Sequence, residues 1–152
     1  MATLIGAGGH AQDIVATGYY LPRYAHHDDY KPGHAVVVIA VNDPHLRAEI
    51  ATKLGIHDTT WIHPRAHIGP GCTFGDGCHV NYSASMTRTQ LGDHVTVSPG
   101  ATVCGDVTIG DRTLGGAGAV ICDRVTIGND VTIGAGTIVL PESVIPDGTT
   151  WV

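Results

Sequence analysis

A six-residue repeat runs through the second half of the chain. Apolar residues recur at every sixth position from Ile62 to Met86, and after a slip of one residue the series resumes at Leu91 and continues to Ile145, with Gly115 as a small member. A small or β-branched residue stands two positions before these anchors, and glycine often follows them. Helices repeat every 3.6 residues and strands every 2.0, so neither explains the pattern. A hexapeptide period is typical of a parallel β-helix.

Three such hexads predict a triangular coil of about 18 residues, in which each anchor points inward and stacks on its counterpart one coil away. Residues 62–150 supply about five coils, and a strand spacing of about 4.8 Å gives a prism roughly 24 Å tall. Stacked aliphatic side chains would fill this core, which accounts for 21 glycines and only 5% aromatic residues. The cysteines fit the same scheme: Cys72 and Cys78 fall at the small inward position and are predicted to be inert, and Cys104 and Cys122 each follow an anchor.

Charge and hydropathy exclude several classes of protein. The net charge is −6 and no basic run occurs, so a nucleic-acid partner is not expected. The longest apolar stretch, residues 35–41, is far shorter than the roughly 20 residues of a membrane span. The N-terminus does not have the pattern of a signal peptide, and the four cysteines lack zinc-type spacing. We therefore expect a cytoplasmic protein with reduced cysteines and no membrane contact.

The first part of the chain follows a different pattern. Residues 1–60 hold six glycines and residues 61–152 hold fifteen, so we place a domain boundary between residues 60 and 61. Residues 2–5 are predicted to form a strand, residues 6–11 a turn, and residues from 12 to about 20 a helix. The β-branched run 35–41 is typical of a strand that is buried on both faces.

A second helix is predicted after this strand. Asp43 is a suitable N-cap, Pro44 suits the first helical position, and Gly55 ends the helix. Its apolar residues lie on one face, as in an amphipathic helix: Leu46, Ile50 and Leu54. Two successive strand–turn–helix units predict a parallel βαβ arrangement. The predicted fold is therefore an α/β, Rossmann-like N-terminal domain (1–60) followed by an all-β parallel β-helix of hexapeptide repeats (61–152).

The glycine-rich turn of the first domain has a physical role of its own. Glycines allow a ligand to approach the backbone closely, and the N-terminus of the following helix favours a diphosphate. We therefore consider Gly8, Gly9 and His10 as substrate contacts, although a simple tight turn and a helix-capping histidine explain them equally. Asp28 or Asp29 follows about twenty residues later, where a dinucleotide fold places its ribose-binding acid, and a solvated loop is the alternative.

The combination of Gly-Ala-Gly-Gly-His-Ala at residues 6–11 with hexapeptide repeats resembles the bacterial sialic-acid O-acetyltransferase and nucleotide-amino-sugar N-acetyltransferase family. Further supporting stretches are 27–31, 38–43 with Arg47, 62–66, 91–93, 98–101 and 103–110. The resemblance implies a left-handed β-helix, a homotrimer, acetyl-CoA as co-substrate and a nucleotide-activated sugar as acceptor, with no metal. It also implies that Gly105 and Gly116 contact the cofactor.

The chain departs from this family at the catalytic position. Members use a histidine as general base, in a segment that corresponds here to residues 86–93. Counting back from Leu91 places Thr87 at that position, and counting forward from Asn81 places Arg88 there. Neither side chain is a plausible base at pH 7. A second family histidine, near the thiol of CoA, corresponds to Thr96.

Other residues then become candidates for the catalytic set, which we take as His79, Asn81, Thr87, Arg88 and His94. His79 and Thr96 are 17 residues apart, one coil minus the missing residue, so we expect them to stack side by side on one face. His79 is then either a base or CoA contact, or an exposed surface histidine. His94 is a second candidate base. His63 is expected to be structural, and His67 to lie on another face.

Three classes of function remain. The first is an acetyl-CoA-dependent acetyltransferase with a relocated or weakened base, for which an amine acceptor needs less help than a hydroxyl. The second is a non-catalytic trimeric binding or scaffold protein that retains the nucleotide and CoA grooves. The third, a zinc hydrolase of the carbonic-anhydrase type, would need three converging histidines, and His63, His67, His79 and His94 lack its five-residue spacing.

Overall fold

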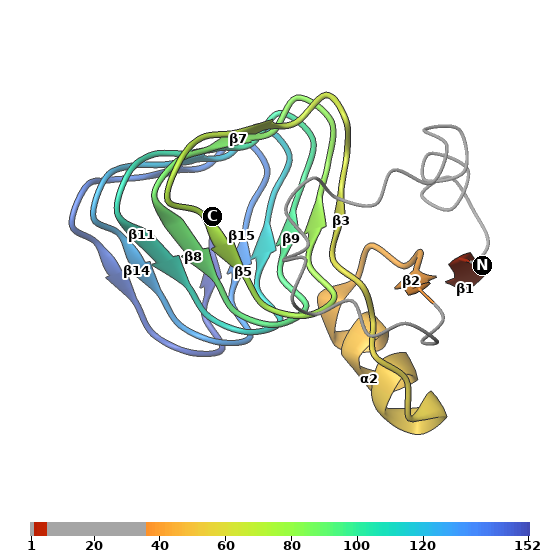
Figure 1. Ribbon diagram of the computed structural model, residues 1–152. Helices are drawn as coiled ribbons and strands as arrows, with labels where there is room; N and C mark the ends of the chain where they lie inside the picture. Colours follow the sequence, from red (N-terminus) through yellow and green to blue (C-terminus); the bar gives the residue numbers. More distant parts are fainter. Residues whose placement is uncertain (1, 6–35) are drawn as a thin grey trace.

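The computed structural model describes residues 2–5 and 36–152, which form a parallel β-solenoid of stacked coils preceded by a short α/β segment (Figure 1). In chain order the elements are β1 (Ala2–Ile5), β2 (Val36–Ile39), α2 (Pro44–Leu54), β3 (Trp61–Ile62), β4 (His67–Ile68), β5 (Thr73–Phe74), β6 (His79–Val80), β7 (Ser85–Met86), β8 (Thr89–Leu91), β9 (Thr96–Val97), β10 (Thr102–Val103), β11 (Val107–Ile109), β12 (Leu114–Gly115), β13 (Val120–Ile121), β14 (Thr126–Ile127), β15 (Thr132–Ile133), β16 (Ile138–Val139), β17 (Val144–Ile145) and β18 (Thr150–Trp151).

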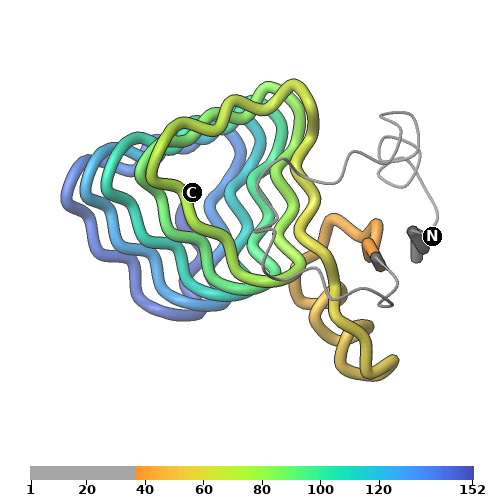
Figure 2. Tube along the Cα trace, viewed as in Figure 1, coloured from red at the N-terminus to blue at the C-terminus, as the bar shows by residue number. Residues whose placement is uncertain are grey.

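The solenoid has three faces, each of which is one parallel sheet. The first face holds β3, β6, β9, β12, β15 and β18, the second holds β4, β7, β10, β13 and β16, and the third holds β5, β8, β11, β14 and β17. Every third strand is therefore a neighbour, and each coil lies directly on the previous one, as the tube in Figure 2 shows. The parallel β-solenoid predicted from the hexapeptide period is confirmed.

Left-handed backbone residues turn the chain at three corners. The glycine corner lies between the first and second faces and holds Ser83, Gly100, Gly118 and Gly136. The arginine corner lies between the second and third faces and holds Gly71, Arg88, Asp106, Arg124 and Glu142. The histidine corner lies between the third and first faces and holds Gly77, His94, Arg112, Asp130 and Gly148. A non-glycine residue in this conformation costs roughly 1–2 kcal/mol. Backbone hydrogen bonds between coils offset that cost, such as the one from the Arg112 N–H to Asp93 O at 2.8 Å.

The slip in the repeat is located at the arginine corner. Ser85 in β7 pairs with Thr102 in β10, 17 residues further on. Arg88 faces Asp106 at the full spacing of 18 residues. Between Met86 and Arg88 there is therefore one residue, Thr87, whereas the next coil has two residues at the same place, between Val103 and Asp106. The predicted slip is confirmed.

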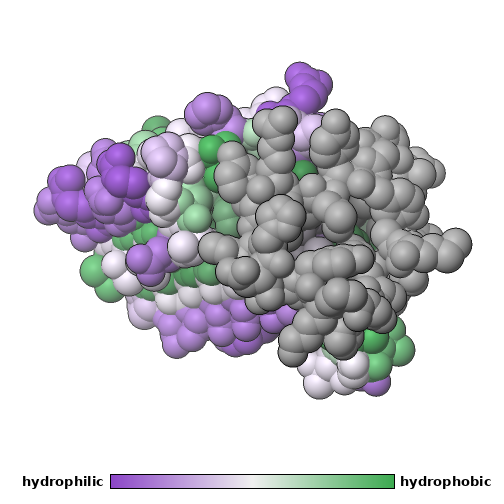
Figure 3. All heavy atoms as spheres, in the orientation of Figure 1, coloured by the Kyte–Doolittle hydropathy of each residue, from purple (hydrophilic) through white to green (hydrophobic). Residues whose placement is uncertain are grey.

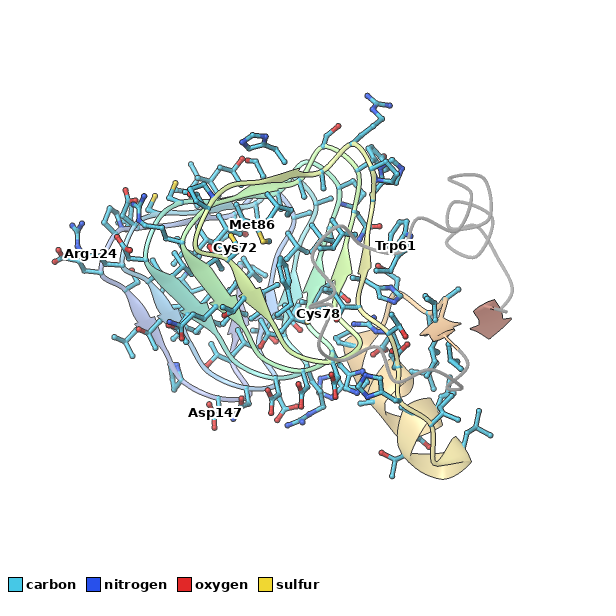
Figure 4. All side chains as sticks on the ribbon, viewed as in Figure 1. Trp61, Cys72, Cys78, Met86, Arg124 and Asp147 are labelled. Atoms are coloured by element: carbon cyan, nitrogen blue, oxygen red, sulfur yellow. The ribbon has the colours of Figure 1, made fainter. Side chains whose placement is uncertain are left out.

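The core of the solenoid consists of the stacked anchors and of the small residues that precede them. Figure 4 shows Cys78 and Met86 inside the solenoid, and both are buried. The buried anchors are Ile62, Val80, Met86, Leu91, Val97, Val103, Ile109, Ile121, Ile127, Ile133, Val139 and Ile145. Cys72, Ile68 and Phe74 are only partly buried because they lie in the first coil, which has a neighbouring coil on one side only within residues 36–152. Gly115 is buried among these residues without a side chain, which leaves the core thin at its level.

A polar ladder runs along the edge of the third face next to the histidine corner. Asp93 accepts a hydrogen bond from the Asp76 N–H, and Asp111, Asn129 and Asp147 accept equivalent bonds from the residue one coil earlier, at 2.8 to 2.9 Å. Figure 3 shows hydrophilic residues along the lower edge of the solenoid, where Figure 4 places Asp147. At these turns, side-chain oxygens instead of backbone carbonyls accept the hydrogen bonds of the backbone N–H groups.

The α/β segment agrees with the predicted parallel arrangement where it is described. β1 and β2 pair in parallel, with Ala2 opposite Val36. Asp43 caps α2 by accepting hydrogen bonds from the N–H groups of His45 and Leu46, and Gly55 ends the helix in the left-handed conformation. The predicted helix 12–20 lies outside the described residues.

The buried side of α2 is not its leucine face. Leu46 and Leu54 are 45% and 55% exposed, whereas Pro44, Arg47 and Ala51 are buried. The helix turns this side inward because the Arg47 guanidinium is the group that binds the solenoid. No helix in the described part of the chain is long and apolar enough to span a membrane.

Candidate active site at the junction of helix α2 and the solenoid

Arg47 connects α2 to the first coils of the solenoid. Its side chain is completely buried, and all of its nitrogens are hydrogen-bonded. Nε donates to Gly77 O at 2.9 Å, Nη1 donates to Val41 O at 2.8 Å and to the Thr96 hydroxyl at 3.0 Å, and Nη2 donates to His94 O at 2.7 Å. Burial lowers the pKa of Arg47 to about 10, against the opposing effect of the nearby Asp58 carboxylate. The guanidinium is therefore still charged at neutral pH.

Asp58 supplies the buried negative charge of this junction. Its Oδ1 accepts a hydrogen bond from the Ile39 N–H at 2.9 Å, which connects it to the end of β2. Its Oδ2 lies 3.7 Å from Arg47 Nε and 3.6 Å from His94 Nδ1. Asp58 was not among the residues predicted from sequence, since nothing in the local pattern around residue 58 marks it. Only the packing of the loop after α2 against the histidine corner brings it to His94.

His79 and Thr96 are direct neighbours in β6 and β9, as the 17-residue spacing predicted. Both are fully buried, so the alternative of an exposed surface histidine at position 79 is wrong. The ring of His79 packs edge-on against Trp61, with centroids 5.9 Å apart. The Thr96 hydroxyl donates to Asn42 O at 3.0 Å in addition to its bond from Arg47. The predicted contact of Thr96 with a cofactor stays a prediction, and in one copy of the chain Thr96 is a structural link.

Thr87 and Arg88 lie at a different place, the arginine corner. The Arg88 guanidinium is exposed and forms an ion pair with Asp106, with Nε 3.0 Å from Oδ1. That hydrogen bond raises the pKa of Arg88. The same guanidinium covers Gly105, where any added side chain would collide with Nη2. The Gly105 N–H itself donates to Asp123 Oδ1 at 2.9 Å.

The remaining predicted residues occupy a third place. Gly116 follows β12 and approaches the next coil so closely that a Cβ would lie 2.6 Å from Ala135 N. Asn81 follows β6 and donates to Val97 O at 3.0 Å. One chain therefore brings His94 and Thr96 together at Arg47, with His79 beside Thr96, but it holds Thr87, Arg88 and Gly105 at the arginine corner and Gly116 near the glycine corner. The predicted nucleotide contacts lie outside the described residues: Gly8, Gly9, His10, Asp28 and Asp29.

The histidines of the zinc-hydrolase alternative do not gather in one copy of the chain. His67 lies in β4 on the second face, and His79 lies in β6 on the first, as predicted. His63 follows β3 and packs edge-on against Trp61 and Tyr82. Across residues 36–152, no group of three or more histidine, cysteine or acidic side chains is arranged to hold a metal.

Several solved structures share this architecture over nearly their whole length. The acetyltransferase domain of PglB from Neisseria gonorrhoeae FA1090, in complex with acetyl coenzyme A, is 25% identical over 98% of this chain and 94% of its own, with a TM-score of 0.74. A perosamine N-acetyltransferase from Caulobacter crescentus, in complex with CoA and GDP-perosamine, is 22% identical over 98% of this chain and 91% of its own, with a TM-score of 0.72. WeeI from Acinetobacter baumannii AYE is 17% identical over 99% and 95%, with a TM-score of 0.59.

The predicted resemblance to nucleotide-amino-sugar acetyltransferases is confirmed by these structures, and the likeness is one of fold. No protein-family model matches the chain, and no curated protein sequence does. The fold alone does not identify the reacting groups, which have to come from the site itself.

Proposed function

We propose that the chain is an acetyl-CoA-dependent N-acetyltransferase whose acceptor is an amino group of a nucleotide-activated sugar. The observation that carries this proposal is the likeness, over 98% of this chain, to an acetyltransferase domain solved with acetyl coenzyme A. The perosamine N-acetyltransferase that shares the fold was solved with both CoA and a nucleotide sugar. The two parts of the chain suit two ligands, with the acceptor held by residues 1–60 and the donor by the solenoid of residues 61–152.

The proposal includes a finer architecture. The N-terminal unit is Rossmann-like and uses its glycine turn and acidic loop on the nucleotide sugar. The hexapeptide prism is left-handed, and three copies of the chain assemble side by side. The predicted cofactor residues support such an assembly, because Thr96 in β9 and Gly116 after β12 belong to the first face, whereas Gly105 follows β10 at the arginine corner. A groove between two copies can combine two such sides.

The glycine corner is the part of the solenoid that best fits an extended pantetheine arm. Gly100, Gly118 and Gly136 stack one above another at this corner, and a Cβ at any of them would meet nothing within 4 Å. Ala117 and Ala135 beside them are exposed and small. The corner is therefore a strip of nearly bare backbone, which an extended chain of amide and methylene groups can approach closely.

An amine acceptor suits the groups that this chain presents. The amine attacks the thioester carbonyl, loses a proton, and displaces the thiol. A neutral amine is a better nucleophile than a hydroxyl, so correct positioning supplies much of the rate, with effective molarities worth roughly 7–11 kcal/mol. The arginine corner, where the family histidine falls, carries Thr87 and Arg88 instead, and neither accepts a proton at neutral pH.

A non-catalytic scaffold is the second candidate, and one observation favours it. The Arg88–Asp106 ion pair and the Gly105–Asp123 hydrogen bond already satisfy the polar groups of the arginine corner. A corner closed in this way can support a binding protein that holds both ligands without reacting them.

Calorimetric titration and turnover separate the two functions. Acetyl-CoA is titrated into the purified full chain, and thiol release is followed with a panel of nucleotide amino sugars and with the matching hydroxyl sugars. Binding with thiol release that depends on an amino sugar supports the enzyme. Binding without turnover across the panel supports the scaffold, and no binding of acetyl-CoA contradicts both.

A further inference from the structure

We propose that His94, with its Nδ1 held by the buried Asp58 carboxylate, is the general base of the acetyl transfer. This inference rests on the acetyltransferase function proposed above. The observation that supports it is the distance of 3.6 Å between His94 Nδ1 and Asp58 Oδ2. The Asp58 side chain is completely buried, and the His94 side chain is 15% exposed.

One carboxylate oxygen of Asp58, Oδ2, is available to accept a hydrogen bond from His94. Oδ1 accepts from the Ile39 N–H, and Oδ2 is buried without a hydrogen-bond partner among the described residues. Arg47 Nε faces Oδ2 from 3.7 Å but already donates to Gly77 O at 2.9 Å. His94 Nδ1 is likewise buried and without a hydrogen-bond partner in the described part of the chain. A proton on Nδ1 satisfies both atoms after a movement of a few tenths of an ångström, as buried polar groups require.

This arrangement fixes the tautomer of the imidazole. A neutral histidine carries one proton, and a carboxylate that faces Nδ1 holds that proton there. Nε2 is then the proton acceptor, which is the division of roles in a histidine–aspartate pair of a catalytic triad. His79 does not meet this description, because it is fully buried.

The backbone around His94 holds the ring in place. The His94 N–H donates to Asp76 O at 2.6 Å, and the His94 carbonyl accepts from Arg47 Nη2 at 2.7 Å. The residue has a φ of 55°, the left-handed conformation that the corner residues of the other coils share, so its backbone position is set by the regular turn of the solenoid. Gly77, one coil earlier, approaches the pair so closely that a Cβ would lie 2.6 Å from Asp58 Oδ2. Glycine at position 77 is what gives the pair its space.

The position in the fold suits the reaction. Arg47 and Asp58 belong to the segment that follows β2, and His94 belongs to the solenoid. An acceptor held by the N-terminal unit can therefore reach the solenoid next to His94, where these two parts of the chain join. Among the described residues the arginine corner has no such junction, and Arg88 pairs with Asp106 of the solenoid itself.

The charges that face His94 come from all sides of this junction. Asp58 and Arg47 form a buried, nearly neutral pair. Asp76 in the coil before forms an exposed ion pair with His57 at 3.3 Å, and Arg112 lies in the coil after.

In the reaction the acceptor nitrogen bonds to the acetyl carbon, and the carbon–sulfur bond breaks. The proton of the nitrogen passes to His94 Nε2, and the imidazolium returns it to the departing thiolate. The products are the N-acetyl sugar and CoA thiol.

A matched control exists within the chain. His45 Nδ1 lies 3.6 Å from Asp130 Oδ1, the same separation as in the His94–Asp58 pair, but these side chains are 56% and 37% exposed. The two pairs thus differ in burial and place rather than in distance. His45→Asn removes a solvent-screened pair, and His94→Asn removes the buried one.

The experiment compares wild type, His94→Asn, His94→Gln, Asp58→Asn and His45→Asn in acetyl-transfer kinetics from about pH 5 to pH 9, the range that brackets histidine titration. We expect the His94 variants to lose about 10²–10⁴-fold in kcat, as for loss of a general base, with the KM for acetyl-CoA unchanged. The wild-type rate falls as the pH falls and the base becomes protonated, and this limb disappears in the variants. His45→Asn retains the wild-type kcat and profile.

Nitrogen-15 NMR of the histidines in the ligand-free wild type gives a second readout that needs no turnover. A protonated Nδ1 at His94 that becomes mixed in Asp58→Asn supports the pair, and a protonated Nε2 in the wild type overturns it. A wild-type kcat in folded His94→Asn or His94→Gln overturns the inference while leaving the acetyltransferase intact. A wild-type protein that binds acetyl-CoA but never turns over contradicts the proposed function instead.

Discussion

Arg47 Nη1 donates a hydrogen bond of 3.0 Å to the Thr96 hydroxyl, across 49 residues of sequence. This bond joins the segment around α2 to the first face of the solenoid, and the same guanidinium also reaches the third-to-first corner through His94. Because Asp58 is buried beside it, the guanidinium also balances a negative charge that has no access to water. Arg47 is therefore the side chain that contacts the solenoid at the most points of this junction, at Gly77, His94 and Thr96.

Replacing Arg47 is expected to destabilise the protein strongly. Arg47→Met removes the partner of the buried Asp58 carboxylate, and breaking a buried pair in this way costs about 3–5 kcal/mol. Arg47→Met with Asp58→Asn removes both charges and should recover part of the loss. The free energy of unfolding is measured in urea, with exposed Arg65→Met as the control. An Arg47→Met variant as stable as the control would contradict the role of the junction.

Adjacent glycines in β12 and the turn after it should respond in opposite ways to alanine. Gly115 occupies an anchor position, and a Cβ there meets only Thr96 O at 3.6 Å, an ordinary contact. Gly115→Ala is expected to stabilise the fold by about 0.4–1 kcal/mol through the unfolded chain, with some added burial. At Gly116 a Cβ would lie 2.6 Å from the backbone of Ala135, so Gly116→Ala should destabilise it. Melting temperatures of the two variants test this, and a loss of stability in Gly115→Ala would show that the core there is already full.

The four cysteines should divide by reactivity. Cys78 is fully buried, and burial raises the pKa of its thiol to about 12. Burial, together with Asp123 and Cys122, also raises the pKa of Cys104, so its labelling should need a higher pH than that of a free thiol. A thiol reagent at pH 8 is expected to label at most three cysteines in the native protein and four in denaturant. Cys78→Ser should lower only the denatured count, and a drop in the native count would contradict this assignment.

The solenoid could be predicted from sequence because its period depends on single residues at fixed spacing. The six-residue spacing of Val97, Val103 and Ile109 predicts three faces without any knowledge of long-range contacts. In the same way, the spacing of His79 and Thr96 is enough to predict that they lie side by side. The junction could not be predicted in the same way. The apolar face of Leu46 and Leu54 is not the buried face of α2, because the opposite side carries Arg47, whose hydrogen-bond partners lie far along the chain at Gly77, His94 and Thr96.

The Asp58–His94 pair shows the same limit. Neither residue belongs to a local motif, and their approach depends on the loop after Gly55 packing against a corner whose own position depends on the coil count. The spacing of His94 from Thr96 made it a candidate but supplied no partner. A polar contact between a loop outside the repeat and a corner of the solenoid leaves no periodic trace in the sequence, unlike the polar ladder, which follows the 18-residue coil.

The Arg112–Asp130 pair on the histidine corner should make a small, pH-dependent contribution to stability. Arg112 Nε donates to Asp130 Oδ1 at 2.6 Å, and this hydrogen bond lowers the pKa of Asp130 in the folded protein. A carboxyl with a lowered folded pKa stabilises the fold above its unfolded pKa of about 3.9, and the contribution is lost as the pH falls through the folded value. Both side chains are more than one third exposed, at 35% and 37%, so solvent screening keeps the contribution within about 1 kcal/mol. Asp130→Asn should therefore lower the free energy of unfolding slightly at pH 7 and low salt, and the difference from wild type should vanish at about pH 2 and shrink in 1 M salt. A difference that persists at pH 2 would mean that the amide disturbs packing rather than charge.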